Sequence, residues 1–500
     1  MNKILFFNPR SAVGKARFPN AILSVASSVA GKYEWALVDG NLESDPYSKL
    51  RSYLQTGDYK YVGFTVMPGP QAKQAIPFAR QIKEEFPDTT MIWGGYFPGN
   101  HFQVVLESGY VDYIVNGPGE HAFPLLIDAL EKGLPYEFIR NLIYRSADGG
   151  TVKTAKEDLF DQDPLPDLPF DQLNTLYPIE QYLGKTFLGN KTMAYHSSIG
   201  CPFTCAFCAV VPLYEARWKA KSAQKVYRDV KYIKDTWGAD AIEFTDNNFF
   251  VSEKRTVELA NLLKKEEMAW WGMARIDTMD KYSDASLALI REAGCKIIFF
   301  GAESGNDAIL KQLDKGGRQS GEQIERFAAR LRRFDIIPEY SFILGTPAPT
   351  ARQVLAQINY EIAFIKKVKK ANPDTEIIIY LYSPVPMEGS ELFQQVQALG
   401  FKFPARLEDW VTPQWERFDA RKNPLTPWLT PYMVNKIRNF ETVLNGYYPT
   451  VSDIRLNPLK RNLLRFSAGL RYTTNFFHHP YEIKLLQKMW RYRQPETAGF

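Results

Sequence analysis

The stretch of sequence that decides the fold is SIGCPFTCAFC, residues 198–208, which places three cysteines in a CxxxCxxC pattern. It directly follows Met193–Ser197, an apolar segment that is typical of a strand. Three thiolates on one short loop can bind three irons of a [4Fe–4S] cluster and leave the fourth iron open to another ligand. A structural zinc site normally has four protein ligands, so zinc is the weaker alternative for Cys201, Cys205 and Cys208.

The rest of the composition is that of an ordinary globular protein. The chain has 500 residues, of which 45% are hydrophobic and 23% charged, with only four cysteines. These values exclude a disordered chain and a disulfide scaffold. We expect the fourth cysteine, Cys295, to be a buried structural residue. The net charge of +5 predicts no nucleic-acid partner. No apolar run reaches the length of a membrane span or a signal-peptide core, so a cytoplasmic location is expected.

Residues 1–140 alternate short apolar runs with segments of helical length, which predicts a doubly wound, Rossmann-like α/β domain. Strands are expected at Ile4–Phe7, Trp35–Val38, Tyr61–Val66, Met91–Trp93 and Tyr113–Val115. In such sheets ligands bind at the carboxyl ends of the strands. Glycine-rich loops follow the last two strands, at 94–95 and 117–120, and would let a flat ligand approach the backbone. Each loop alone also fits an ordinary turn.

A second α/β region is predicted at 185–395, after a linker at 141–184 that is rich in proline and acidic residues. Its repeated strand–helix units predict a partial (β/α)6 barrel. The expected strands are Met193–Ser197, Ala241–Thr245, Trp271–Arg275, Lys296–Phe300, Glu339–Leu344 and Ile377–Tyr382.

The last part of the chain, residues 396–500, is rich in aromatic and basic residues and predicts a mainly helical cap. Nine Lys or Arg and one acidic residue lie between Arg455 and Arg493. Ile483, Leu486 and Trp490 recur at helical spacing. A helix docked on the barrel is the favoured interpretation, and peripheral contact with an anionic membrane surface is the alternative.

The cysteine pattern, with Phe207 directly before the last cysteine, resembles the radical S-adenosylmethionine (SAM) enzymes, and the resemblance covers residues 185–395. It implies that the open iron binds the amino and carboxylate groups of SAM. An electron from the cluster then cleaves SAM to methionine and a 5′-deoxyadenosyl radical, which removes hydrogen from an unactivated carbon. It also implies an electron donor of the flavodoxin or ferredoxin type.

Two segments at the ends of expected strands resemble SAM-binding segments of that family. EFTDNNF, residues 243–249, implies that Asp246 and Asn247 accept hydrogen bonds from the SAM amino group. GAESGN, residues 301–306, implies that Glu303 and Ser304 contact the ribose or methionine part. Either segment by itself also fits a solvated loop.

Further residues follow in the order that the family resemblance implies. Arg275 belongs to an arginine–aspartate pair with Asp277 after the third barrel strand. Arg318 is a candidate for the SAM carboxylate, because a guanidinium group pairs with a carboxylate in a bidentate fork. Gly345, in ILGTP, is expected near the adenine. The ordered set of segments, rather than any one of them, makes the resemblance specific.

The first domain resembles that of the cobalamin-binding subclass, on the segments Gly94-Gly95, 112–115 and 117–120. The resemblance implies a cobalamin site lined by Met67, Gly94, Gly95, Tyr96, Gly117, Gly119 and Glu120. One departure concerns the Asp-x-His-x-x-Gly pattern whose histidine ligates cobalt in domains of the methionine synthase type. His101 and His121 do not fit it, which leaves the lower cobalt ligand open. A scaffold domain without cofactor is the alternative.

The resemblance as a whole implies a cobalamin-dependent radical SAM enzyme that methylates an unactivated carbon. One SAM molecule would form the radical and another would remethylate the cobalt. The first alternative is cyclisation or rearrangement without methyl transfer, as in the anaerobic tetrapyrrole cyclase of the subclass. The second is a non-enzymatic metal-binding scaffold. The aromatic cap predicts a small, hydrophobic substrate.

Overall fold

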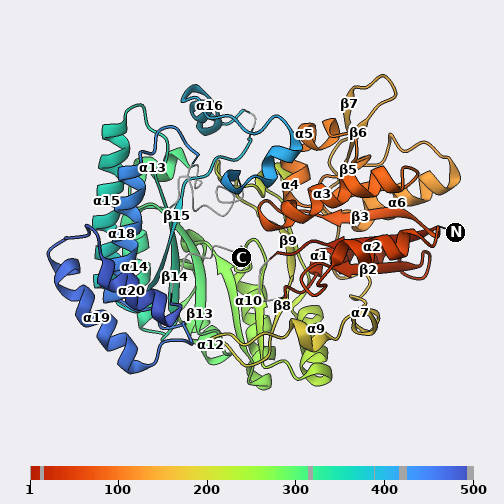
Figure 1. Ribbon diagram of the computed structural model, residues 1–500. Coiled ribbons are helices and arrows are strands. Elements are labelled where there is room, and N and C mark those ends of the chain that lie inside the picture. Colours follow the sequence, from red (N-terminus) through yellow and green to blue (C-terminus); the bar gives the residue numbers. More distant parts are fainter. Residues whose placement is uncertain (1, 12–15, 314–318, 388, 416–424, 493–500) are drawn as a thin grey trace.

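Two parallel sheets, one from each α/β region, form the framework of the computed structural model (Figure 1). The structure describes residues 2–11, 16–313, 319–387, 389–415 and 425–492. Every strand predicted above is present, with ends that shift by up to three residues. The predicted α/β class, with a helical C-terminal region, is confirmed.

The first sheet has the strand order β2-β1-β3-β4-β5-β6-β7 and is parallel from β2 through β5. Its strands are β1 (Lys3–Asn8), β2 (Trp35–Asp39), β3 (Tyr59–Thr65), β4 (Thr90–Gly94), β5 (Tyr113–Val115), β6 (Leu142–Arg145) and β7 (Thr151–Lys153). The last two are antiparallel and were not predicted. The sheet therefore runs past the expected domain end at residue 140, into the expected linker.

Helices cover both faces of this sheet, because β1 and β2 are apolar on both sides. One face is covered by α1 (Asn20–Val29) and α6 (Gly119–Lys132), whose core continues into the second sheet. The other face packs against α2 (Pro46–Leu54), α3 (Pro70–Glu85) and α5 (Phe102–Glu107). The short α4 (Tyr96–Asn100) lies at the carboxyl edge of the sheet. The linker contains α7 (Phe170–Leu176) and the 3-10 turn η1 (Ile179–Tyr182).

The second sheet has the order β15-β14-β13-β12-β11-β8, with all six strands parallel, as a partial barrel requires. Its strands are β8 (Thr192–Tyr195), β11 (Ala241–Phe244), β12 (Ala269–Ala274), β13 (Ile297–Glu303), β14 (Ile337–Leu344) and β15 (Glu376–Leu381). The hairpin of β9 (Ser198–Gly200) and β10 (Trp218–Ala220) was not predicted. These two strands flank the cysteine loop.

Five helices of the barrel begin at Ser or Thr residues that cap the first turn. Ser222, Ser252, Ser283, Ser320 and Thr350 each accept a hydrogen bond from a backbone N–H in the first turn. The helices are α8 (Val211–Tyr214), α9 (Ala223–Trp237), α10 (Glu253–Leu263), η2 (Lys264–Glu266), α11 (Ile276–Met279), α12 (Asp284–Glu292), α13 (Asp307–Gln312), α14 (Gly321–Arg332) and α15 (Ala351–Ala371).

Side chains on the inner side of the curved sheet remain partly exposed, whereas their neighbours in sequence are buried under the helices. Trp271 and Met273 on β12, Phe299 on β13 and Glu339 on β14 follow this alternation. The inside of the partial barrel is therefore not closed by its own side chains, which leaves the carboxyl ends of its strands available for ligands.

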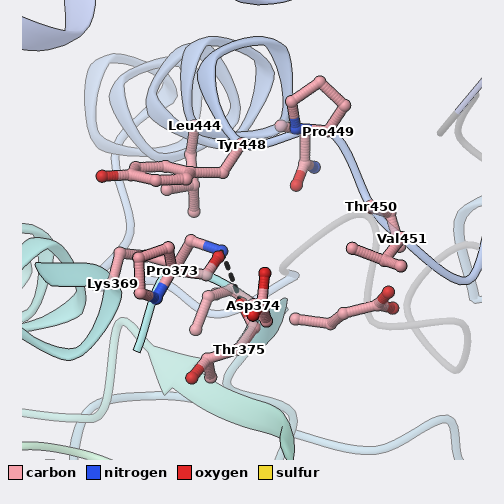
Figure 2. A pocket seen from close by; sticks show the side chains of 12 residues that line it. Lys369, Pro373, Asp374, Thr375, Leu444, Tyr448, Pro449, Thr450 and Val451 are labelled. Carbon is pink, nitrogen blue, oxygen red and sulfur yellow. Dashed lines mark hydrogen bonds between the residues drawn. The ribbon is translucent and has the colours of Figure 1, made fainter. Parts of the chain in front are cut away.

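The C-terminal region packs against both sheets. It contains α16 (Glu391–Ala398), η3 (Leu407–Val411), α18 (Pro431–Tyr447), α19 (Pro458–Thr473) and α20 (Tyr481–Trp490). Trp410 of η3 joins the core below α3. Figure 2 shows a small hollow where α18 meets the barrel, with the Lys369 ammonium 4.4 Å from the centre of the Tyr448 ring. No described helix is long and apolar enough to cross a membrane.

Candidate active site

The three predicted cluster ligands lie on one loop between β9 and α8. Cys205 is buried, and Cys201 and Cys208 are partly exposed. Gly200 starts the loop with φ +74°, and a Cβ there would lie 2.1 Å from the Arg217 carbonyl oxygen, so this turn requires glycine. Burial raises the pKa of the Cys201 thiol, and a hydrogen bond from the Phe203 backbone N–H opposes that increase.

Arg275 brings a positive charge to this loop from the carboxyl end of β12. Its guanidinium donates to Cys205 Sγ at 3.1 Å and lies 3.9 Å from the centre of the Phe203 ring. It also pairs in a fork with Asp277, at 2.9 and 3.0 Å. Metal binds the thiolate form of cysteine, and the guanidinium would lie beside the negative charge of that form.

The three thiols have the chemistry of ligands to an iron–sulfur cluster. Three free thiols share one loop, and an arginine faces the buried one. Among the described residues, no three cysteine, histidine or acidic side chains are already gathered around one metal position. Three thiolates on one loop suit a cluster that leaves one iron open, whereas a structural zinc ion normally takes four protein ligands.

Asp246 follows β11 and is held by the strand that precedes the cysteine loop. Its carboxylate accepts hydrogen bonds from the Ser197 backbone and hydroxyl, at 3.2 and 3.0 Å, and from the Ser198 hydroxyl. Arg255 donates to the Ser197 hydroxyl at 2.8 Å. The predicted SAM contact therefore also fixes the base of the loop.

Asn247 connects the two sheets. Its amide oxygen accepts a hydrogen bond from the Tyr96 hydroxyl at 2.8 Å, and Tyr96 belongs to α4 of the first sheet. Asn100, on the same helix, donates to the Ala209 carbonyl just after the last cysteine, at 3.3 Å. A Cβ at Gly99 would lie 3.3 Å from Leu213 of α8. The cysteine loop thus lies against the carboxyl edge of the first sheet.

Glu303 and Ser304 end β13 in a strained turn. Glu303 has φ +64°, a conformation that L residues adopt mainly where the surroundings enforce it. The Ser304 hydroxyl donates to the buried carboxylate of Glu361 on α15, which also accepts from the Gly305 N–H at 2.8 Å. Burial raises the pKa of Glu361. Glu361 therefore shapes the loop that presents Glu303.

One further predicted SAM contact, Gly345, lies at the end of β14. Gly345 has φ +81° and is covered by the C-terminal region, since Trp428 donates to its carbonyl at 2.9 Å and a Cβ would lie 2.7 Å from Leu429. Arg318 lies outside the described residues.

The residues predicted to line a cobalamin site gather at the carboxyl edge of the first sheet, since β3, β4 and β5 are in parallel register there. Met67 is 42% exposed. A Cβ at Gly94 would lie 3.9 Å from its nearest neighbour, whereas Gly95 has φ +103° and its Cβ would lie 2.7 Å from the Val66 carbonyl oxygen. A Cβ at Gly94 would therefore make only an ordinary contact, whereas Gly95 is required by the backbone itself.

Other residues at this edge have structural contacts. Gly117 has φ +138°. A Cβ at Gly119 would lie 2.9 Å from Val25 of α1, so this glycine lets α1 and α6 pack closely. Glu120 accepts a hydrogen bond from the Ser24 hydroxyl at 2.6 Å. The backbone of Gly117 and the packing at Gly119 account for these two glycines without a ligand. The second carboxylate oxygen of Glu120, Oε2, is buried and has no hydrogen-bond partner among the described residues, so Glu120 joins Met67, Gly94 and Tyr96 as a more informative position.

His101, His121 and Cys295 lie outside the proposed ligand sets and have structural contacts. The His101 ring lies 4.4 Å from the Trp410 ring and 5.0 Å from the Phe403 ring, and burial lowers its pKa to about 3. His121 pairs with Glu157 at 2.9 Å. Cys295 is fully buried, as expected from its apolar context.

Sequence reasoning assigned no role to two residues of the site. Asn248 is buried beside Cys201, and neither atom of its side-chain amide has a hydrogen-bond partner among the described residues. Asn248 belongs to the EFTDNNF segment, residues 243–249, so the sequence could have indicated a role for it. Glu361 lies inside a predicted helix, where nothing in the sequence marks a buried carboxylate.

Comparison with known proteins agrees with this geometry. Residues 195–356 match the model of the radical SAM superfamily. An uncharacterized methyltransferase of Pyrococcus horikoshii is 26% identical over 360 residues, which are 70% of this chain and 74% of the relative. The anaerobic magnesium-protoporphyrin IX monomethyl ester cyclase of Rubrivivax gelatinosus is 24% identical over 460 residues, which are 89% of this chain and 76% of the relative.

Two solved structures share the fold over almost the whole chain. The cobalamin-dependent SAM radical enzyme OxsB, with aqua-cobalamin and SAM bound, has a TM-score of 0.69 at 15% identity and covers 98% of this chain and 75% of its own. The radical SAM methyltransferase TsrM of Kitasatospora setae has a TM-score of 0.66 at 17% identity and covers 98% of this chain and 99% of its own.

Proposed function

We propose that this chain, which contains a radical SAM domain, is a cobalamin-dependent enzyme that methylates an unactivated carbon. One observation carries the proposal: α4, at the carboxyl edge of the first sheet, donates hydrogen bonds both to the cysteine loop, from Asn100 to the Ala209 carbonyl, and to the segment after β11, from Tyr96 to Asn247. An iron–sulfur cluster, SAM and a corrin would then share one site. The relative of Pyrococcus horikoshii and the TsrM structure are named methyltransferases, and OxsB is named a cobalamin-dependent SAM radical enzyme, which supports the methyl transfer and the cobalamin of this proposal respectively.

The chain's own residues would hold and orient these groups. Cys201, Cys205 and Cys208 would bind three irons, with Arg275 stabilising the Cys205 thiolate. When bound, the cluster supplies an electron for SAM cleavage and cobalamin supplies a methyl group. The hydrogen bond between Tyr96 and Asn247 would keep the two halves of the site in register.

The SAM contacts that we propose follow the segments at the strand ends. Asp246 and Asn247 would face the amino group, and Glu303 would face the ribose or methionine part. The strained backbone at Glu303 supports this, since such strain clusters at functional sites. Ser304 would act through Glu361 as a positioning residue. Gly345 would lie near the adenine.

The corrin contacts that we propose are centred on Met67, whose side chain is exposed, and on Gly94, where a Cβ would meet no clash. Gly95, Gly117, Gly119 and Glu120 would shape the edge of the sheet that the corrin meets. We also propose the domain division 1–140, 141–184, 185–395 and 396–500, with β6 and β7 extending the first sheet.

We propose a small hydrophobic substrate inside the barrel. Trp271 and Phe299 are partly exposed on its inner side, and Trp428 covers the end of β14. A flavodoxin or ferredoxin type of donor would supply the electron, in a cytoplasmic setting. The C-terminal helices would provide peripheral membrane contact.

A second candidate is ring closure or rearrangement without methyl transfer. The specific observation in its favour is that the magnesium-protoporphyrin ester cyclase of Rubrivivax gelatinosus aligns with 89% of this chain. The fate of the SAM methyl group separates the two reactions.

The experiment begins with the purified chain from cobalamin-supplemented cells, reconstituted anaerobically with iron and sulfide. We expect corrin absorbance, about four irons per chain, and 5′-deoxyadenosine after reduction with SAM present. With methyl-labelled SAM and candidate substrates, label in the product supports methylation. Deoxyadenosine with an unlabelled, altered product supports the cyclase alternative. Failure to bind iron or to cleave SAM would refute both.

A further inference from the structure

An apolar stripe runs along the outer face of α19. Leu459, Leu463, Phe466 and Leu470 are 77, 47, 86 and 76% exposed. Their spacing of four, three and four residues places them on one side of the helix. This stripe differs from the face that the sequence indicated in this region, Ile483, Leu486 and Trp490, which packs inward.

The opposite face of α19 anchors the helix to the protein. Leu464, Ala468 and Tyr472 are buried there, and the Lys366 ammonium of α15 donates to the Tyr472 carbonyl at 2.8 Å. The stripe therefore faces away from the core because the helix is fixed by its other side.

The neighbouring α20 repeats this arrangement. Tyr481, Leu485 and Met489 recur every four residues and are 68, 66 and 62% exposed, whereas Ile483 is fully buried. Phe476, in the connection between the helices, is 53% exposed. In Figure 1 both helices lie at the end of the molecule opposite the first sheet. The two helices together, residues 458–490, form what we call the outer apolar surface.

The charges around the outer apolar surface are almost all positive. The exposed basic residues between 455 and 492 are Arg455, Arg465, Lys484, Lys488 and Arg491. The one acidic residue in that range, Glu482, is paired with Arg471 at 2.5 Å. Two copies of such a surface would repel each other, whereas an anionic surface would be attracted.

We propose that the outer apolar surface docks on an anionic phospholipid bilayer. The stripe would enter the boundary between headgroups and acyl chains with α19 lying in the membrane plane, and the flanking Lys and Arg would bind headgroup phosphates. Apolar patches of this kind mark interaction sites, and the positive rim selects lipid as the occupant. The proposal refines the membrane contact proposed above and does not depend on the chemistry in the barrel.

The test is co-sedimentation of the reconstituted full-length chain with vesicles. We expect binding to vesicles of 70% phosphatidylcholine and 30% phosphatidylglycerol, and weak binding to phosphatidylcholine alone. Phe466→Ser with Leu470→Ser should reduce the partition coefficient at least about tenfold, because each side chain would lose its buried apolar area. Lys484→Gln with Lys488→Gln should reduce binding only to the anionic vesicles.

The matched control makes the same changes at exposed apolar residues elsewhere. Phe138 and Leu134 are 71 and 52% exposed beyond α6, so Phe138→Ser with Leu134→Ser should leave binding unchanged. All variants should keep the melting temperature and SAM cleavage of the wild type. The proposal is overturned if the wild type does not bind anionic vesicles, or if the stripe variant binds as well as the control. It is also overturned if the wild type sediments as a dimer without lipid and the stripe variant as a monomer.

Discussion

Replacing Arg275 by methionine tests the electrostatic design of the cysteine loop. The side chains of Arg275 and Asp277 are 7 and 3% exposed. The substitution leaves the Asp277 carboxylate buried and unpaired, and breaking a buried pair in this way costs about 3–5 kcal/mol. It also removes the hydrogen bond that Cys205 Sγ accepts at 3.1 Å. We therefore expect loss of both stability and iron binding.

The assay separates these two losses. For a unit of about 150–250 residues, 1 kcal/mol corresponds to roughly 2–4 °C, so the melting temperature of the iron-free variant should fall by about 6–20 °C. Circular dichroism measures the melting temperature, and iron is quantified after anaerobic reconstitution. The double variant Arg275→Met/Asp277→Asn removes both charges and should recover most of the melting temperature but not the iron. Melting of the single variant within about 2 °C of the wild type would refute the buried-pair argument, and so would a double variant no more stable than the single one.

Four further substitutions test other parts of the structure. Cys205→Ala should abolish iron binding and SAM cleavage, whereas the buried Cys295→Ala should retain both; equal iron in the two variants would refute the ligand assignment. Burial keeps folded His101 neutral, with a pKa of about 3 against 6.5. The unfolded state therefore gains a proton as the pH falls below 6.5, which lowers stability by about 2 kcal/mol at pH 5. His101→Leu should make denaturant unfolding less pH-dependent between pH 7 and 5, and an unchanged slope would contradict this. Gly95→Ala should destabilise the first sheet by a few kcal/mol, because its Cβ would lie 2.7 Å from the Val66 carbonyl oxygen at φ +103°; a wild-type melting temperature would count against that strain.

The strands of both sheets could be predicted because each is a short apolar run between helical segments. Two of the missed strands lack that signal, since β7 has two exposed residues out of three and β10 is only partly buried. The pairing of these two depends on neighbouring strands rather than on their own sequence. In contrast, β6 buries Leu142, Ile143 and Tyr144 and was missed although it is a short apolar run. Because β6 and β7 were missed, the predicted end of the first domain at residue 140 fell before the end of its sheet.

In the candidate site, local features could be predicted from the sequence, whereas contacts between distant residues could not. The cysteine loop and the segments at the strand ends could be located from local patterns, since parallel strands bring their carboxyl ends to one edge. The bond between Tyr96 and Asn247 joins residues 151 positions apart, and no local pattern specifies such a pair. The support of Ser304 by Glu361 is equally non-local, at 57 positions.

The contact between α4 and the cysteine loop has a consequence for biogenesis. The loop is followed by α8, and Leu213 of that helix packs close to Gly99 of α4. The ribosome releases the first sheet before the cysteines are synthesised, and domains generally fold in that order. We therefore expect α4, which packs behind the cysteine loop, to be folded before iron is delivered. A barrel fragment that begins near residue 185 would have to bind iron without α4. Assembly of the cluster should therefore depend on the first α/β region, although that region contributes no cysteine ligand.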